Sequence, residues 1–169
     1  IVHAGVGRKF QNPSVYDDLT VFENLELSYP KGRNVFGALT FKRTKEVLDA
    51  IHETAEMVFL DDMLDQSAAL LSHGQKQWLE IGMLLIQNPS LLMLDEPVAG
   101  MSVAERKKTA ELLRKITNDR SVIVIEHDMN FVADIANRVT VMHQGKLLSE
   151  GSMNHVQNDP KMVEVYLGH

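Results

Sequence analysis

The sequence contains no cysteine and no long apolar run, and these absences exclude several classes of protein. Without cysteine the chain can form neither disulfide bonds nor thiolate metal sites. No apolar run approaches the roughly 18 residues of a membrane-spanning helix, and no signal peptide is visible. The seven histidines do not cluster at metal-ligand spacing, so no zinc site is predicted. These absences favour a soluble cytosolic protein.

The composition suits a single folded domain. The chain has 169 residues, enough for about one domain, and 44% of them are apolar, enough for a core. Its net charge of -6 argues against a nucleic-acid-binding surface. The first residue is Ile1 rather than methionine, which is consistent with a piece of a longer protein.

Three pairs of polar residues have the spacing of a capping box and predict where helices begin. They are Thr20 with Glu23, Ser72 with Gln75, and Ser102 with Glu105. A further helix is predicted over residues 44–59, because its apolar residues fall on one face. Asn88 and Pro89 close the helix that begins at Ser72, so residues 12–89 are predicted to be mostly helical.

Further along the chain, the pattern changes to strands that alternate with helices. Short apolar runs within 91–96 and 121–128 are typical of buried parallel strands. A hairpin is predicted around Gln144, and a last helix is predicted after Asp159. Together with a short strand within 6–11, this is the pattern of an α/β fold.

Polar residues follow both apolar runs, at the carboxyl ends of strands, where open parallel sheets bind ligands. Asp95 and Glu96 follow the first run, and His127 follows the second. Carboxylates there suit a hydrated magnesium ion and a base that activates water, and a histidine suits a phosphate oxygen. Each residue alone also fits a solvated strand end or a structural histidine, so both interpretations stay open at this point.

The helix start Leu-Ser-His-Gly-Gln, residues 71–75, indicates a second kind of site. Gly74 stands in the first turn, where glycine lowers helix stability but lets a phosphate or another backbone approach. Unpaired N–H groups and the helix dipole at such an end attract anions. The alternative is that Ser72 and Gln75 only cap the helix, which requires no ligand.

Four segments, in this order, resemble the motifs of the ATP-binding subunits of ABC transporters. They are "RKFQ" (8–11) for the glutamine loop, "LSHGQ" (71–75) for the signature motif, "LLMLDEP" (91–97) for the Walker B strand and "IEHD" (125–128) for the switch-histidine loop. The resemblance covers the whole chain and implies an α/β fold of the P-loop NTPase (ABC ATPase) class, here a helical subdomain plus the C-terminal half of the parallel-sheet core. The implied segments are the end of the N-terminal core with the glutamine loop (1–11), the helical subdomain with the signature motif (12–89), a RecA-like core half with Walker B, D-loop and switch histidine (90–150), and a C-terminal helical tail (151–169).

Longer stretches are similar to the group of ABC transporters that takes up branched-chain amino acids and urea. These stretches are "GRKFQNPSVYDDLTVFENLEL", "DEPVAGM" and "EGSMNHVQNDPKMVEVYLG". The segment "LSHGQKQWLEIGMLL" and the tail most resemble the ATP-binding subunits of urea transporters, of the UrtD type. His73 matches that subgroup, whereas most ABC proteins have glycine there. The resemblance therefore implies a bacterial importer in which ATP hydrolysis drives solute uptake.

The resemblance implies a role for each residue at the strand ends. Asp95 would hold Mg²⁺, largely through water, and Glu96 would be the general base for the attacking water. Gln11 would reach the Mg²⁺ and that water. His127 would contact the γ-phosphate of ATP and stabilise the developing charge.

The resemblance also implies partners. Ser72, Gly74 and Gln75 would act on ATP held by a second ATP-binding subunit, in a homodimer or a heterodimer. Transmembrane permease subunits and, indirectly, a periplasmic solute-binding protein would complete the assembly, without nucleic acid. The subunit would be cytoplasmic and peripheral, on the inner face of the cell membrane.

One family motif does not occur in the 169 residues. They contain no Gly-x-x-x-x-Gly-Lys-Ser/Thr, the Walker A loop that cradles phosphates and supplies a lysine. We therefore expect the parent protein to be an ATPase and the 169-residue chain alone to be inactive. Two alternatives stay open: a non-enzymatic ABC-like fragment, and an ABC ATPase that works outside transport, on nucleic acid or the ribosome.

Overall fold

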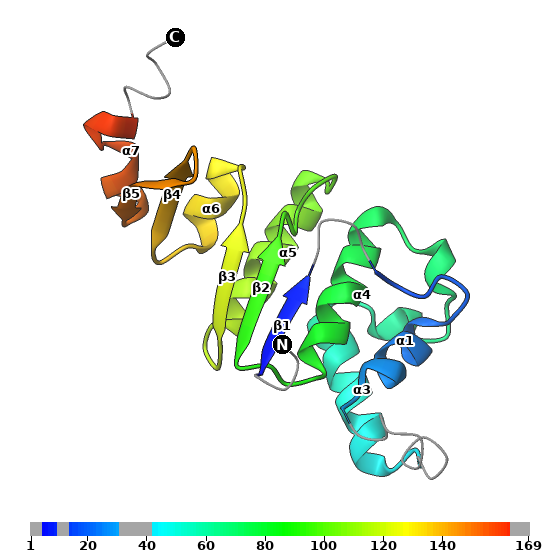
Figure 1. Cartoon of the computed structure of the whole chain (residues 1–169). Coiled ribbons are helices and arrows are strands. Elements are labelled where there is room, and N and C mark those ends of the chain that lie inside the picture. The colour runs from blue at the N-terminus through cyan, green and yellow to red at the C-terminus, as the bar shows by residue number, and fades with distance from the viewer. Residues whose placement is uncertain (1–4, 10–13, 31–41, 163–169) are drawn as a thin grey trace. The chain divides into compact units, whose positions relative to one another are not determined.

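The structure, a computed structural model, describes residues 5–9, 14–30 and 42–162 (Figure 1). The chain forms two compact units, Ile1–Ile125 and Glu126–His169. The first unit contains a parallel sheet with helices, and the second contains a hairpin with short helices.

Three parallel strands form the sheet of the first unit, in the order β1–β2–β3. They are β1 (Val6–Lys9), β2 (Leu91–Asp95) and β3 (Ser121–Ile125). β2 pairs with both neighbours, and the register places Arg8, Met93 and Ile123 in one row across the sheet. This arrangement confirms the α/β class and the parallel strands predicted from the apolar runs.

The helices of the first unit begin where the sequence predicts. They are α1 (Val21–Ser28), α3 (Lys45–Met57), α4 (His73–Leu85) and α5 (Val103–Ile116), with the short 3-10 helices η2 (Asp61–Met63) and η3 (Ala68–Leu70). In all three capping boxes the cap hydroxyl accepts a hydrogen bond from the N–H of the third helical residue. The side chain of that third residue accepts a bond from the N–H of the cap in return. Local sequence therefore sets these starts, because each box satisfies N–H groups that a helix start leaves unpaired.

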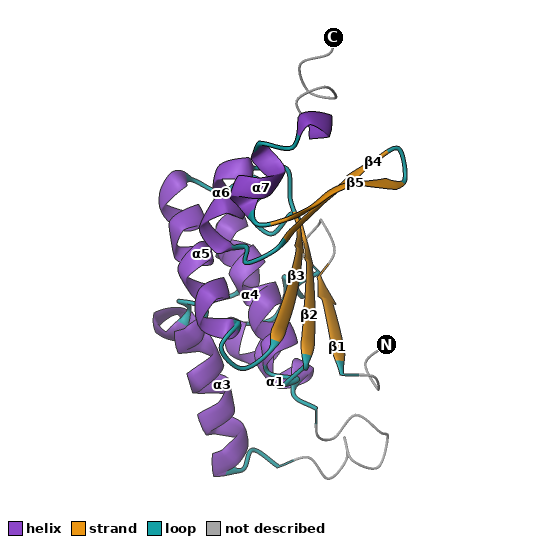
Figure 2. Cartoon of the chain, turned by 90° about the vertical axis from the view of Figure 1, so that its left-hand side faces the viewer, coloured by secondary structure: helices purple, strands orange, loops and turns teal. Residues whose placement is uncertain are grey.

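In the described part of the first unit, helices cover one face of the sheet (Figure 2). α4 packs against β1, and α5 lies on the same side as α4. On this side Leu92 and Leu94 are 0% and 1% exposed, whereas Ile123 and Ile125 on the opposite face are 47% and 55% exposed. The strands thus carry apolar side chains on both faces, but only one face is buried.

The predicted hairpin forms the centre of the second unit. Its antiparallel strands are β4 (Val139–His143) and β5 (Lys146–Gly151). The turn residues Gln144 and Gly145 have φ angles of 48° and 75°, the positive values that a type I′ hairpin turn requires. Val139, Val156 and Met162 form a small core in this unit.

Two short helices flank the hairpin in the chain. They are α6 (Met129–Ile135) and α7 (Met153–Gln157). α7 lies within the helical tail (151–169) that the family resemblance implies, and its local signal is the cap Ser152, which accepts a bond from the N–H of His155. Residues 160–162 are helical, and the rest of the predicted last helix lies outside the described residues. No helix within the described ranges is both long enough and apolar enough to span a membrane.

The open face of the sheet predicts that the 169-residue chain self-associates. Exposed side chains such as Ile123 and Ile125 gain free energy when they leave water, and exposed apolar patches mark contact sites. We expect sedimentation to show concentration-dependent association, with the Kd raised about tenfold when both isoleucines become threonine. Leu70→Thr is the control, because Leu70 is 72% exposed and lies outside the sheet. A monomer at all concentrations, or equal effects of the two variants, would contradict this prediction.

Candidate functional site

The two adjacent carboxylates lie where β2 ends. Asp95 is the last residue of β2, and Glu96 has a φ of 45°, in the left-handed region that is uncommon for residues other than glycine. The N–H of Glu96 donates to the carbonyl oxygen of Ile125 at 2.9 Å, which ties Glu96 to the end of β3. Backbone strain of this kind concentrates at functional sites. The structure therefore holds Glu96 at the carboxyl ends of the strands, where ligands of α/β proteins bind.

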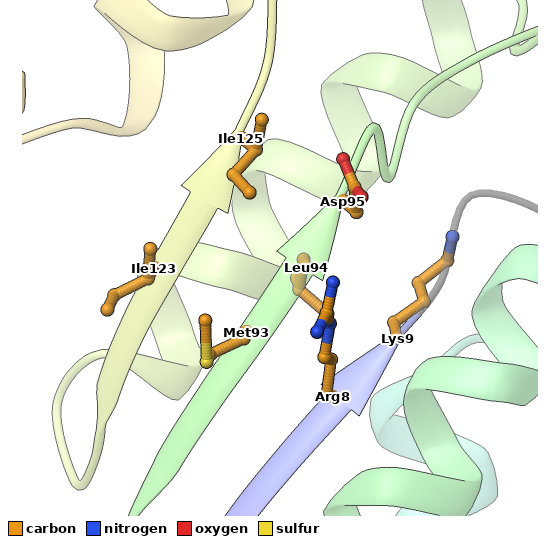
Figure 3. Close-up of a pocket in the computed structure, with 7 residues that line it drawn as sticks. All are labelled: Arg8, Lys9, Met93, Leu94, Asp95, Ile123 and Ile125. Carbon is orange, nitrogen blue, oxygen red and sulfur yellow. The ribbon is translucent and has the colours of Figure 1, made fainter. Parts of the chain in front are cut away.

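Asp95 lines a shallow pocket on the open face of the sheet (Figure 3). The lining residues are Arg8, Lys9, Met93, Leu94, Asp95, Ile123 and Ile125. Within the described part of the chain, no three His, Asp or Glu side chains gather closely enough to hold a metal ion. The single carboxylate of Asp95 still suits Mg²⁺, which keeps several waters and takes further oxygens from phosphates. Asp95 therefore fits the role of one magnesium ligand among waters and phosphate oxygens.

The loop that follows Glu96 contacts the first turn of α4. Nε2 of His73 lies 3.1 Å from the carbonyl oxygen of Ala99. Gly100 has a φ of 71°, and a Cβ there would lie 3.1 Å from Cδ2 of the His73 ring. Glycine at position 100 is therefore favoured both by the backbone conformation and by the ring beside it.

The start of α4 also meets a carboxylate from α5. A Cβ on Gly74 would collide with the carboxylate of Glu105. The carboxylate of Glu105 accepts hydrogen bonds from the N–H and the hydroxyl of Ser102, at 2.8 and 2.7 Å. The anion that approaches Gly74 in this structure is thus a side chain of the chain itself.

Trp78 fixes α4 to α5 behind these contacts. Its side chain is 5% exposed, and its indole N–H donates to the hydroxyl of Thr109 at 2.9 Å. The ring packs edge-on against Phe59, with 5.2 Å between the ring centroids. Trp78 is therefore a packing residue that sets how the start of α4 faces α5.

A buried ion pair that the sequence patterns do not reveal joins β1 to α4. Nζ of Lys9 lies 3.6 Å from the carboxylate of Glu80, and the two side chains are 0% and 7% exposed. The N–H of Ser14 donates to the same carboxylate at 3.3 Å. Burial raises the pKa of Glu80, and the charge of Lys9 opposes that rise. Glu80 thus contacts the chain at Lys9 and at Ser14, on either side of residues 10–13. The predicted site residue Gln11 lies outside the described residues.

His127 belongs to the second unit. Its side chain is 80% exposed, and its Nδ1 lies 4.0 Å from the carboxylate of Glu126. The backbone N–H of His127 donates to that carboxylate at 3.1 Å. The structure therefore places both strand-end carboxylates and the α4 start in the first unit, and the predicted switch histidine in the second.

The parallel sheet with helices on one face is an α/β fold, and the solved structures that resemble it are ATP-binding cassettes, of the P-loop NTPase fold. The family model described as "ABC transporter" matches residues 1–99. The chain belongs to this family.

Similar proteins include ATP-binding proteins of branched-chain amino acid transport. BraF of Pseudomonas aeruginosa, a protein of high-affinity transport, is 32% identical to this chain, and LivG of Escherichia coli K12 is 33% identical. Each match covers 99% of this chain and 69% of the relative.

Solved structures of ABC transporter cassettes are also similar. A nucleotide-free ATP-binding cassette matches with a TM-score of 0.76 at 28% identity, and a cassette in its ADP conformation matches with 0.77 at 30% identity. Each match covers 99% of this chain and 70% of the solved chain. These likenesses confirm the ABC ATPase fold class that the motifs imply.

The bonds to Glu105 predict an acid-sensitive part of the stability. The N–H of Ser102, followed by its hydroxyl, lowers the pKa of Glu105 below its usual value. Ionised Glu105 therefore stabilises the fold above its unfolded pKa of about 4.3, and this contribution is lost as the pH falls through the folded pKa. Glu105→Gln keeps the capping box but not the charge. We expect it to be less stable at pH 7 by about 0.5 kcal/mol, a modest amount because the group is partly exposed.

Chemical unfolding between pH 7 and pH 3 measures the free energy of unfolding of wild type and of Glu105→Gln. The difference between the two should narrow below about pH 4. Glu111→Gln is the matched control, because Glu111 is an exposed glutamate on the same helix. A difference that stays constant over this range, or that is the same for the control, would show that ionised Glu105 does not stabilise the fold.

Proposed function

We propose that the chain is part of the ATP-hydrolysing subunit of an ABC importer, which couples hydrolysis to the uptake of urea or a branched-chain amino acid. The observation that carries this proposal is the Asp95–Glu96 pair at the end of β2, with Glu96 held in a left-handed conformation. The relatives BraF and LivG, which are named for branched-chain amino acid transport, support the amino acid alternative. The resemblance of "LSHGQKQWLEIGMLL" and of the tail supports the urea alternative.

In this proposal the strand-end residues divide the chemistry of hydrolysis. Asp95 holds Mg²⁺ through water, and Gln11 adds a second contact; bound Mg²⁺ neutralises charge on the phosphate oxygens. Glu96 orients the attacking water and accepts its proton as the water oxygen bonds to the γ-phosphorus and the bond to ADP breaks. His127 donates a hydrogen bond to a γ-phosphate oxygen, which stabilises the developing charge.

The start of α4 acts on ATP that a second subunit holds, in a homodimer or a heterodimer. The hydroxyl of Ser72 and the N–H groups around Gly74 and Gln75 suit phosphate oxygens, because a helix start carries partial positive charge. The Ser72 side chain also helps to lower the pKa of the Glu105 carboxyl in this structure. The hydroxyl of Ser72 has one proton to donate, and a phosphate oxygen of the bound ATP accepts it when the dimer closes.

The remaining segments provide the connection to transport. Residues 12–89 are the helical subdomain that meets the transmembrane permease subunits, and a periplasmic solute-binding protein delivers the solute to them. Residues 1–11 and 90–150 belong to the nucleotide core, and 151–169 form the C-terminal tail. The subunit works at the inner face of the cell membrane. The 169 residues alone hydrolyse ATP negligibly, because they contain no Gly-x-x-x-x-Gly-Lys-Ser/Thr to hold the phosphates.

Glu96→Gln tests the general base. The chain is assayed alone and fused behind the phosphate-loop segment of an ABC ATPase. We expect no turnover by the chain alone and clear turnover by the fusion. Glu96→Gln should lower kcat of the fusion at least about 100-fold without weakening ATP binding, because glutamine cannot accept the proton. Asp119→Asn is the control, because Asp119 is an exposed carboxylate just before β3, at the other end of the sheet.

Each part of this proposal has an outcome that would contradict it. Robust hydrolysis by the 169-residue chain alone would show that the phosphate loop is dispensable. Unchanged turnover of the fusion with Glu96→Gln would remove Glu96 from the role of base. Salt-sensitive binding of the chain to DNA or RNA would favour an ABC ATPase outside transport.

Uptake assays decide between the two solutes. In cells whose own gene carries Glu96→Gln, we expect loss of uptake of either labelled urea or labelled leucine, with uptake of the other unchanged. The same cells with Asp119→Asn should keep both activities. Normal uptake of both solutes in the Glu96→Gln cells would contradict the importer proposal.

A further inference from the structure

The imidazole of His73 lies between the start of α4 and the loop that carries Glu96. Its Nε2 is 3.1 Å from the carbonyl oxygen of Ala99. A carbonyl oxygen only accepts, so the tautomer that makes this contact a hydrogen bond is the one with the proton on Nε2. The N–H of Ala99 donates in turn to the carbonyl oxygen of Glu96 at 3.2 Å. Two consecutive hydrogen bonds therefore run from the His73 ring to the backbone of Glu96.

The surroundings of the ring hold it in this place. Gly100 leaves the space that Cδ2 of His73 occupies, because a Cβ on Gly100 would lie 3.1 Å from that atom. On its other side, the terminal amide of Gln77 lies 3.2 Å from Nε2, and the Gln77 side chain is completely buried. The atom of Gln77 that faces the ring is its amide nitrogen, which cannot donate to a protonated Nε2, so Gln77 holds the ring by packing rather than by a second hydrogen bond. The ring is thus oriented by neighbours from both its own helix and the loop.

The loop itself needs such an anchor. Glu96 and Gly100 both have positive φ angles, 45° and 71°, and a backbone in this region persists only where its surroundings hold it. The first residue of the loop, Glu96, is bonded to Ile125 at the end of β3, and the last residue, Ser102, caps α5. Between these two points, the bond from His73 to Ala99 connects the loop to α4.

We propose that His73 is a positioning residue for Glu96, which acts by donating a hydrogen bond from Nε2 to the carbonyl oxygen of Ala99. The catalytic meaning of this role rests on the proposed function, in which Glu96 is the base. Because the start of α4 acts on the ATP of the second subunit, His73 also connects that site to the base at the chain's own site. A movement of the α4 start then reaches the Glu96 turn through two hydrogen bonds.

Paired substitutions separate this bond from simple packing. Glutamine places its Nε2 where the ring Nε2 of histidine lies, whereas asparagine places its nitrogen near the ring Nδ1 and cannot reach Ala99. Amide hydrogen exchange in the 169-residue chain, followed by NMR, reports on the loop through Ala99 and Met101, whose N–H groups donate within it. We expect His73→Asn to speed exchange of both amides about fivefold, and His73→Gln to stay within about twofold of wild type. Amides of α3 should not change in either variant.

Three results would overturn the proposal. They are wild-type exchange in His73→Asn, equally fast exchange in both variants, or faster exchange that extends into α3. A ¹⁵N chemical shift of His73 that shows an unprotonated Nε2 at neutral pH would also overturn it, because such a ring cannot donate to Ala99. None of these measurements depends on hydrolysis. A failure of the His73 proposal is therefore distinguishable from a failure of the Glu96→Gln test.

Discussion

The pairing of β2 with both of its neighbours is the constraint on which the candidate site depends. Parallel strands cannot be joined by a tight turn, so the chain between β1 and β2 must leave the sheet and return. Here it does so through the helical segment that ends in α4, and α4 packs back on β1. The same pairing aligns the ends of β2 and β3, so that the N–H of Glu96 reaches the carbonyl oxygen of Ile125. The position of the candidate base thus follows from the strand register.

Charged groups, as well as apolar ones, decide how α4 sits on this sheet. The Lys9–Glu80 pair is buried between β1 and α4, and breaking a buried pair leaves a charge without its counterion, which costs several kcal/mol. At the start of α4, Glu105 supplies negative charge where the helix dipole favours it. These contacts hold the helix at its start and in its middle, so the first turn of α4 faces the loop that follows Glu96.

Local interactions explain which features could be predicted. Each capping box needs residues only three positions apart, and all three form as the sequence predicts. The long-range contacts could not be predicted, because nothing in the sequence around Lys9 names Glu80 as its partner. Likewise, His73 contacts Ala99 at a separation of 26 residues, and no pattern links the two positions. The bounds of the short helix α7 could not be predicted for another reason, since its local signal is a single serine cap.

The sequence by itself determined the helix starts, the hairpin turn, the apolar strands and the kinds of side chain that follow them. All of these depend on neighbours within a few residues, where backbone hydrogen bonding and side-chain alternation act directly. Only the tertiary structure decided that Ile123 and Ile125 face outward, that Glu105 reaches Gly74 and that His73 meets Ala99. These outcomes depend on how distant segments pack, because burial and pairing are properties of the assembled layers rather than of any one segment.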